Sequence, residues 1–416
     1  KKMVDTLFHM SHQFGNQRMF APEVIRDIGM GAIALGEIID PLLKFDELFG
    51  DENARTLGVG LAYYCTDLST GFFDENGDVV GNQLYRSGIS ILSGVLRAAR
   101  LTQDASLFAR GKQIHDRLSS YVTRYGSTPC TEPACSNMEL IYSAIHLAET
   151  VDASYYDRYV RNQTKEAQFL TKSEWHRELA HEGRITGEEF RWVFGNYSDT
   201  LDTLPYDYYG DDVLDKSEGG FLWTDFSEHR FVPASLMLCC SGHARRSFHL
   251  VAEKMIHPTI QGFDVNFHYS FENEYAELIS YEPFEGKFVV IPKKCTQKIR
   301  VRIPEYWEKT KLQIFSEGAE ILFKIEGNYV VIQNAEAGQE IQFKYPLESY
   351  ITEENVYRNI NSIPCFQFKV RVEWKGNTVI RLLDHCSENP KMIYKHVSND
   401  YIYGGKPLKV SGHINW

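Results

Sequence analysis

The feature of this 416-residue sequence that most limits its fold is a change in hydrophobic periodicity near residue 260. Before this point, apolar residues such as Ile89, Leu92 and Leu96 recur every three or four positions, which predicts amphipathic helices. After it, apolar residues alternate with polar ones between short turns, as in the run 299–303, which predicts antiparallel strands. We therefore expect a helical domain over residues 1–258 and a β-sandwich over residues 259–416.

The helical half is organised as helix, short break, helix. The periodicity predicts helices around 89–99, 108–118, 138–148, 155–160 and 248–255, with a break at Thr102–Asp104. Stacked helical hairpins can close into an (α/α)6-barrel-like toroid, and this is the fold class we expect ahead of the sandwich. Fewer hairpins can be traced than such a toroid needs, and the chain opens with Lys1 in a helical pattern. We therefore expect the first hairpin to be partly missing.

Composition excludes several classes of partner. A net charge of −12 disfavours nucleic acid and anionic membranes as ligands. The sequence contains no apolar run of the roughly 18 residues that span a bilayer. Three of the eight cysteines, Cys295, Cys365 and Cys386, fall in strand-like runs, where we expect them to be buried.

The most specific chemical feature is the adjacent pair Cys239 and Cys240, which is followed by Ser-Gly-His243 and a helical pattern. A thiolate at a helix N-terminus is stabilised by unpaired N–H groups and the helix dipole, which lower its pKa. Such a cysteine can act as a nucleophile or bind a metal. The alternative is that both are simply buried thiols.

A second cluster comprises Cys130, Glu132, Cys135 and Glu139, and Cys135 is again close to a predicted helix start. Glu139 follows Cys135 by four residues and therefore lies on the same helical face. Three thiolates and one carboxylate would complete a tetrahedral zinc site. A disulfide between Cys130 and Cys135 is the competing interpretation.

The Cys-Cys-x-x-x-x-Arg helix start at 239–245 resembles that of family 127 glycoside hydrolases, which include β-L-arabinofuranosidases. Further segments resemble motifs of this family in the same order along the chain. They are Gly81-Asn-Gln-Leu-Tyr-Arg86, Leu101-Thr-Gln-Asp104, Glu132–Glu139, Tyr155–Gln163, Gly219-Gly-Phe221, Tyr281–Gly286, Val301–Glu305 and Trp374–Val379.

The resemblance implies an (α/α)6 barrel with β-sandwich domains and retaining hydrolysis by a zinc-bound cysteine. Carried over, Cys239 is the nucleophile, and Cys135 and Cys240 join it as zinc ligands. The family's ligand carboxylate falls at Pro133, so the neighbouring Glu132 is expected to replace it, with Glu139 as the alternative.

Substrate contacts are expected from three positions on this alignment. Gln83 and Tyr85 occupy a segment in which many relatives carry histidines, and His243 follows the cysteine pair. The expected ligand is a plant or microbial oligo- or polysaccharide, in a protein of the bacterial cytoplasm or periplasm. Two other functions remain open: a non-catalytic carbohydrate-binding relative, and a lyase or epimerase on the same toroid, which would use His and Tyr residues without metal.

Overall fold

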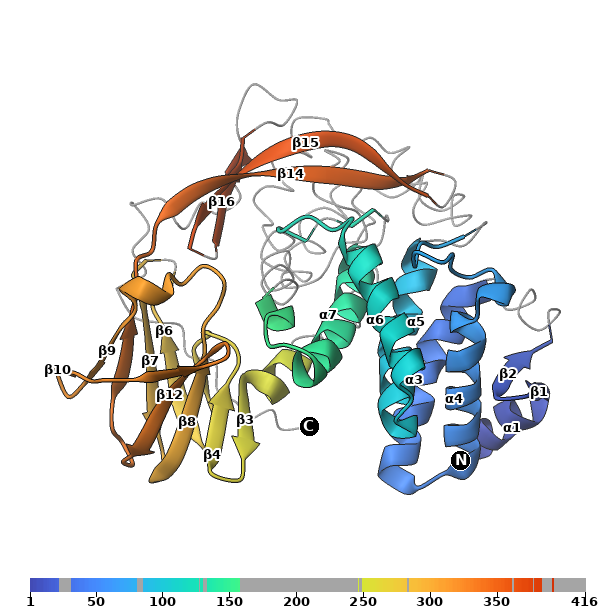
Figure 1. Cartoon of the computed structure of the whole chain (residues 1–416), viewed down its shortest axis with the longest axis horizontal. Coiled ribbons are helices and arrows are strands. Elements are labelled where there is room, and N and C mark those ends of the chain that lie inside the picture. The colour runs from blue at the N-terminus through green and yellow to red at the C-terminus, as the bar shows by residue number, and fades with distance from the viewer. Residues whose placement is uncertain are drawn as a thin grey trace, which may run out of the picture. The chain divides into compact units, whose positions relative to one another are not determined.

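A computed structural model describes residues 1–21, 31–80, 85–126, 128–129, 133–157, 246, 249–282, 284–360, 363–376, 378–383 and 391–392. These residues form two compact units (Figure 1). The helical unit holds the described residues from 1 to 151 and from 355 to 368. The sandwich unit holds those from 152 to 157, from 246 to 354 and from 369 to 392. The predicted domain ranges 1–258 and 259–416 stay a prediction.

The helical unit begins with a short helix and a β-hairpin, and long helices follow. Its elements are α1 (Lys2–Met10), β1 (Ser11–Phe14), β2 (Gln17–Phe20), α3 (Gly31–Phe49), α4 (Glu52–Thr66), the 3-10 helix η1 (Leu68–Thr70), α5 (Tyr85–Thr102), α6 (Ala105–Ser119) and α7 (Pro133–Thr150). Three of the predicted helices are confirmed as α5, α6 and α7. Of the other two, residues 155–157 and 249–255 are helical.

The break between α5 and α6 has a local cause. Gln103 takes a left-handed conformation with φ 55°, which ends α5. Asp104 then caps α6, because its carboxylate accepts hydrogen bonds from the backbone N–H groups of Ser106 at 2.8 Å and Leu107 at 3.0 Å. The predicted break at Thr102–Asp104 is confirmed.

Helices α3 and α5 approach each other closely because glycine lies at their contact. A Cβ atom added to Gly94 would meet Ile39 Cγ2 at 2.4 Å and the backbone nitrogen of Asp40 at 3.0 Å. A Cβ atom added to Gly36 would meet Ser90 Oγ at 2.2 Å. The absence of side chains at these two positions lets the helix backbones pack together.

The sandwich unit contains two facing sheets, ordered β10-β9-β13-β7-β6-β5 and β11-β12-β8-β4-β3. Neighbouring strands pair antiparallel except β4 and β8, which are parallel. The strands are β3 (Ile256–Thr259), β4 (Gly262–Val265), β5 (Phe271–Glu272), β6 (Ala276–Ser280), β7 (Lys287–Pro292), β8 (Thr296–Arg302), β9 (Gln313–Ser316), β10 (Ala319–Glu320), β11 (Lys324–Glu326), β12 (Tyr329–Ala335) and β13 (Ile341–Lys344), with the 3-10 helix η4 (Lys309–Lys311) before β9.

The core of the sandwich follows the period-two pattern. Ile299 and Val301 on β8 are fully buried, and so are Phe288 and Val290 on β7. Trp307 packs among these side chains and stacks on Tyr345 with a centroid distance of 4.2 Å. These side chains line a shared interior, as the sequence predicts, and on β7 the intervening Val289 is buried as well.

A third sheet is built from β14 (Ser349–Ile360), β15 (Ile363–Lys375), β16 (Thr378–Leu382) and β17 (Lys391–Met392). Strands β14 and β15 form a long two-stranded ribbon (Figure 1). Residues 355–368, at the turn end of this ribbon, belong to the helical unit, and the remaining described residues of the sheet belong to the sandwich unit.

The segment directly after α7 folds onto the sandwich unit. Arg302 on β8 forms an ion pair with Asp157, with 2.5 Å between Nη1 and Oδ1, and both side chains are buried. The ring of Tyr156 packs edge-on against Phe267. Asp152 accepts a hydrogen bond from Asn328 at 3.1 Å. Residues 152–157 are thus held by one buried ion pair, one aromatic contact and one exposed hydrogen bond.

The order of helices first and antiparallel sheets second is confirmed. The part of the chain that the structure describes does not show a closed helical ring, so the toroid stays a prediction. The expected burial of Cys295 is wrong, because this residue lies exposed in the turn between β7 and β8. Cys365 is half-buried, and Cys386 lies outside the described residues.

Candidate functional site

The first candidate site is the end of the helical unit at which α5 and α7 begin. Gly88 near the start of α5 lies next to Leu118 near the end of α6, so these two helices are antiparallel. Ser93 of α5 bonds to Glu139 of α7, and Arg97 lies within electrostatic range of His146, so α5 and α7 run in the same direction. The N-termini of α5 and α7 therefore lie at the same end, with the C-terminus of α6 beside them.

Two of the predicted site residues lie at this end. Tyr85 is the first residue of α5, and Cys135 lies in the first turn of α7, which begins at Pro133. Proline suits the first helical position because the N–H that it lacks would have no partner in the helix. The unpaired N–H groups of such a turn favour a thiolate over a thiol. The backbone position of Cys135 therefore suits the ligand role predicted for it.

Most of the predicted site lies outside the described residues. This holds for Gln83, Glu132, Cys239, Cys240 and His243. It also holds for Cys130, whose disulfide with Cys135 was the competing interpretation to a zinc site. The side chains of Tyr85 and Cys135 are likewise not described. Within the described ranges, no group of three or more His, Cys, Asp or Glu residues is arranged to hold a metal ion.

Glu139, the alternative carboxylate ligand, is described and is buried in the packing between helices. Its side chain is only 6% exposed, and Ser93 Oγ donates a hydrogen bond of 3.4 Å to its Oε2 atom. In α6, His115 Nδ1 shares a hydrogen bond of 2.8 Å with Ser143 Oγ, and Ser143 also donates to the Glu139 carbonyl. This layer of hydrogen bonds between α5, α6 and α7 offsets the cost of burying polar groups. Glu139 thus lies within a buried layer of hydrogen bonds, and its role as the alternative ligand stays a prediction.

A second polar cluster joins α3, α5 and α7. Arg97 forms ion pairs of 2.7 Å with both Asp40 and Glu47, and its side chain is 9% exposed. Although burial opposes it, the pKa of the Arg97 guanidinium is raised because these two carboxylates favour its charge. Burial, followed by the charge of Arg97, lowers the pKa of His146 to about 4. His146 is therefore neutral at pH 7. Arg100 Nη2 lies 3.1 Å from Glu47 and supplies the second positive charge that balances the two carboxylates, so the cluster is a structural network.

A third cluster lies at the C-terminal end of α6 and was not found from the sequence. Tyr121 donates a hydrogen bond of 2.6 Å to Asp78, which also receives Arg117 Nε at 2.8 Å. Tyr357 of β14 packs edge-on against Tyr121 with a centroid distance of 5.2 Å. Phe366 of β15 packs in the same manner against Tyr357 at 6.1 Å. All five side chains belong to the helical unit.

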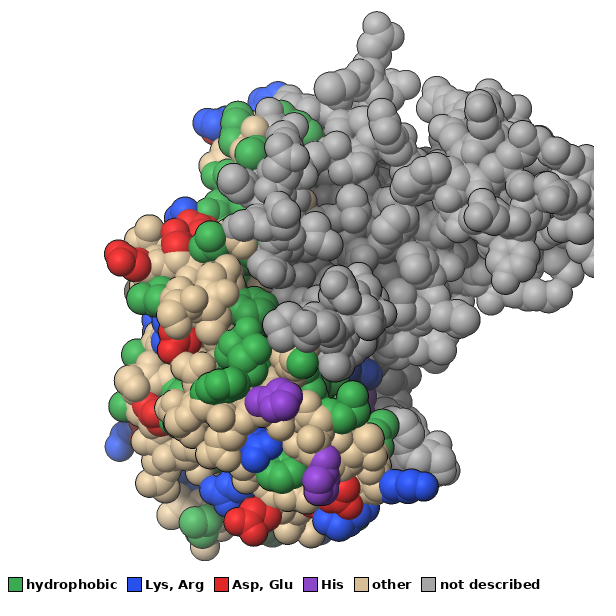
Figure 2. Space-filling model, turned by 90° about the vertical axis from the view of Figure 1, so that its right-hand side faces the viewer, with side chains coloured by type: hydrophobic (Ala, Val, Ile, Leu, Met, Phe, Trp, Pro, Cys, Tyr) green, Lys and Arg blue, Asp and Glu red, His purple; other side chains and the backbone are tan. Residues whose placement is uncertain are grey.

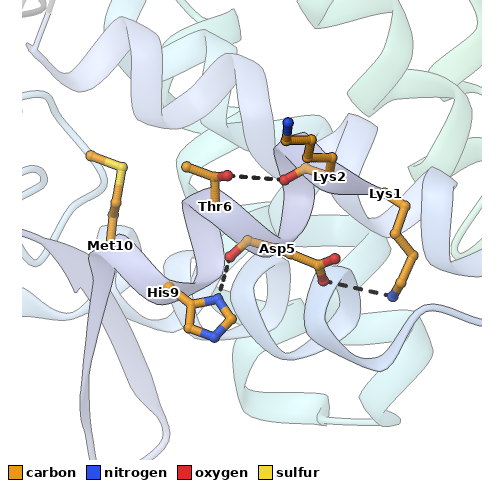
Figure 3. A pocket seen from close by; sticks show the side chains of 6 residues that line it. All are labelled: Lys1, Lys2, Asp5, Thr6, His9 and Met10. Atoms are coloured by element: carbon orange, nitrogen blue, oxygen red, sulfur yellow. Dashed lines mark hydrogen bonds and ion pairs between the residues drawn. The ribbon is translucent and has the colours of Figure 1, made fainter.

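A shallow, open pocket lies on α1 (Figure 3) and contains none of the predicted site residues. Several of its polar groups are already engaged. Lys1 bonds to Asp51 at 2.6 Å and also lies 3.6 Å from Asp5, and His9 Nδ1 lies 2.6 Å from the Asp5 carbonyl; Figure 3 shows the last two contacts. Around α1, the surface carries hydrophobic side chains between charged ones (Figure 2). The side chains that line the pocket are those of Lys1, Lys2, Asp5, Thr6, His9 and Met10. We assign no function to this pocket.

No known family model matches the sequence, and no curated protein matches it significantly. Solved structures do match. A GH127 β-L-arabinofuranosidase from Geobacillus stearothermophilus T6 aligns with 83% of this chain at 12% identity and a TM-score of 0.50. A second GH127 β-arabinofuranosidase aligns with 91% of the chain at 13% identity and a TM-score of 0.56. A third structure, described as a glycoside hydrolase, aligns with 91% at 12% identity and a TM-score of 0.58.

The chain has a GH127-like fold. At 12–13% identity, the likeness extends to the fold and not to the sequence family. The chain spans 58–64% of the length of these three structures. Among the described helices, none is long and apolar enough to cross a membrane.

Proposed function

We propose that this protein is a retaining glycoside hydrolase that acts on β-L-arabinofuranosides of a plant or microbial glycan. The observation that carries the proposal is the likeness to two solved GH127 enzymes, which align with 83% and 91% of the chain. The positions of Tyr85 and Cys135 support it, because both lie at the helix end where α5 and α7 begin. The helical unit is proposed to complete an (α/α)6 toroid around this end.

We propose Cys135, Cys239, Cys240 and Glu132 as the zinc site. Thiolates and a carboxylate are preferred zinc ligands, and the helix start at Cys135 suits an ionised sulfur. When bound, zinc would keep the cysteine thiols ionised near neutral pH. The buried hydrogen bond from Ser93 to Glu139 argues against Glu139 as the fourth ligand.

In the proposed reaction, Cys239 Sγ attacks the anomeric carbon, and the bond from that carbon to the leaving oxygen breaks. An acidic group supplies the proton that the leaving oxygen takes up. Water then attacks the same carbon, and the carbon–sulfur bond breaks, which releases the sugar and restores the thiolate. The group that gave its proton to the leaving oxygen takes up the proton that the water loses. Two inversions at one carbon retain its configuration. Gln83, Tyr85 and His243 are proposed to bind the sugar hydroxyls.

The test combines metal content with hydrolysis. We expect one zinc per chain in the purified protein, lost in Cys135→Ala and Cys240→Ala, and release of aryl alcohol from an aryl β-L-arabinofuranoside with retained configuration. Cys239→Ser should abolish hydrolysis. Cys295→Ser is the matched control, because Cys295 is exposed on the sandwich unit and its loss should change neither zinc nor rate. If the protein binds no zinc when zinc is supplied under reducing conditions, the proposed mechanism is wrong.

The second candidate is a carbohydrate-binding protein without catalysis. The observation that favours it is Pro133, which begins α7 at the position where the resemblance places a ligand carboxylate. This candidate predicts glycan binding without zinc and without hydrolysis. The same two measurements therefore distinguish the two functions.

A further inference from the structure

The aromatic cluster at the turn end of the β14–β15 ribbon is partly exposed. Phe366 is 53% exposed, although it is a large apolar side chain in a strand. Tyr357 and Tyr121 beside it are only half-buried. The three rings lie in a row, with centroid distances of 5.2 and 6.1 Å. The outer ring of the row is therefore accessible to a ligand, and the two inner rings are partly accessible.

The polar groups beside this row are held in place. Arg117 lies over the ring of Tyr121 at 5.0 Å and directs Nε and Nη2 to the carboxylate of Asp78. A guanidinium has five N–H donors, so others remain for a ligand. The Arg117 side chain is 42% exposed and the Asp78 side chain 25% exposed, which leaves both within reach of solvent. The cluster therefore combines an apolar row with fixed, accessible hydrogen-bonding groups.

This combination matches the chemistry of a carbohydrate. One face of a sugar ring carries C–H groups that pack on aromatic rings, and its edge carries hydroxyls that bond to planar charged groups. Aromatic side chains with a few fixed polar groups are the usual composition of a small-molecule site. Adjacent rings meet edge-on, at 72° and 77°, so they present their faces at different angles. A glycan that packs on neighbouring rings must therefore turn from one sugar to the next.

The position of the row adds to the argument. Tyr121 directly follows α6, whose C-terminus lies at the same end of the helical unit as the first turns of α5 and α7. The residues of the ribbon that contribute to the row are also part of this unit. The row is thus at the helix end that carries Cys135, where a glycan chain would enter the proposed site.

We propose that Tyr121, Tyr357 and Phe366 form an aromatic glycan-binding row, with Arg117 and Asp78 as its hydrogen-bonding groups. The row binds sugar units of the chain beyond the one that is cleaved, and in this sense the proposal rests on the proposed function. It makes the ribbon a part of substrate recognition for polymers and not for single sugars.

The experiment compares Phe366→Ala with Phe284→Ala, a matched control because Phe284 is 60% exposed on the sandwich unit. Binding is measured by affinity electrophoresis in gels that contain soluble arabinan, arabinogalactan or xylan. We expect at least one of these polymers to retard the wild type. Phe366→Ala should weaken that binding about tenfold, which corresponds to about 1.4 kcal/mol. Phe284→Ala should bind like the wild type, and Phe366→Tyr should retain most of the affinity.

Kinetics with an aryl β-L-arabinofuranoside separate this proposal from the proposed function. If the wild type hydrolyses this small substrate, Phe284→Ala should leave both kcat and KM unchanged, because the proposal places Phe284 neither in the catalytic site nor in the row. If the wild type hydrolyses the substrate and Phe366→Ala is retarded as strongly as the wild type, the proposed binding row is wrong and the proposed hydrolase function stands. If retardation depends on Phe366 but no hydrolysis is found, the proposed hydrolase function is wrong and the proposed binding row stands. A wild type that no polymer retards would overturn the row.

Discussion

The buried ion pair between Arg302 and Asp157 gives the sharpest stability prediction. The Arg302 side chain is 4% exposed, and besides Asp157 it donates only to the Asn266 carbonyl, at 2.6 Å, among the described residues. Asp157→Asn keeps the shape of the side chain and removes its charge. The guanidinium then stays buried without a counter-charge, a situation that costs about 3–5 kcal/mol. Because an asparagine oxygen can still accept one hydrogen bond, we expect the lower end, about 3 kcal/mol.

Thermal melting followed by tryptophan fluorescence can detect this loss of stability, because Trp307 and Trp374 are buried in the sandwich unit. For a unit of this size, about 3 kcal/mol corresponds to a decrease in Tm of roughly 6–12 °C. The double variant Asp157→Asn with Arg302→Met removes the unpaired charge and should recover a part of the stability.

The matched control is Glu353→Gln, which breaks the ion pair with Lys369. Both side chains of that pair are more than half exposed, and the atoms are equally close, at 2.5 Å. Exposed pairs contribute about 0–1 kcal/mol, so the Tm should hardly change. If Asp157→Asn has the same Tm as Glu353→Gln, then the burial of Arg302 does not make its ion pair with Asp157 important for stability, and the reasoning fails.

Two further predictions concern the helical unit. The pKa of His146 is about 4 in the folded chain against 6.5 in the unfolded one, so the unfolded chain binds more protons between these values, and stability falls as the pH drops from 6.5 to 4. His146→Gln should remove about 3 kcal/mol of this decrease in the free energy of unfolding, measured from urea midpoints at pH 7 and pH 4. His9→Gln, at an exposed position, is the control. If the pH dependence of His146→Gln is that of the wild type, the burial of a neutral His146 is not its cause. Gly94→Ala should cost about 1–3 kcal/mol through the contact of its Cβ with Ile39, and an unchanged Tm would show that α3 and α5 can move apart freely.

Periodicity predicted the regular elements well wherever one face of the element is apolar. This is the case for α5, α6 and α7, and for strands such as β7, β8 and β12. The hairpin β1–β2 was not predicted, because the residues 11–20 carry few apolar side chains. A signal was present, since the two strands are separated by Gly15 and Asn16, and Gly15 takes a left-handed φ of 59°.

Residue type alone misled the prediction at Cys295. A cysteine in a strand-like run is more often buried, but the two residues before it are Lys293 and Lys294, which indicate a solvated turn. At Glu139, helical spacing was compatible with both a metal ligand and a buried residue. Ser93 on α5 supports burial, and a contact between two helices cannot be derived from the spacing within one.

Contacts between distant parts of the chain were beyond the sequence. Asp157 and Arg302 are 145 positions apart, and neither lies in a pattern that names its partner. The row of Tyr121, Tyr357 and Phe366 likewise depends on the path of a ribbon. Such pairs follow from topology, which hydrophobic periodicity does not specify.

The interleaving of the two units along the chain has a consequence for synthesis. Residues 355–368 belong to the helical unit but leave the ribosome after nearly all of the sandwich has been made. Domains made from one continuous segment can fold in turn, N-terminal first, as they emerge. Here Tyr121 of the helical unit must wait for Tyr357, and Asp157 of the sandwich unit must wait for Arg302. The helical unit therefore cannot finish folding until both facing sheets of the sandwich unit have been made. In a nascent chain stopped near residue 258, Tyr121 and Asp157 would both lack their partners. We expect such a chain to depend on chaperones far more than the full chain.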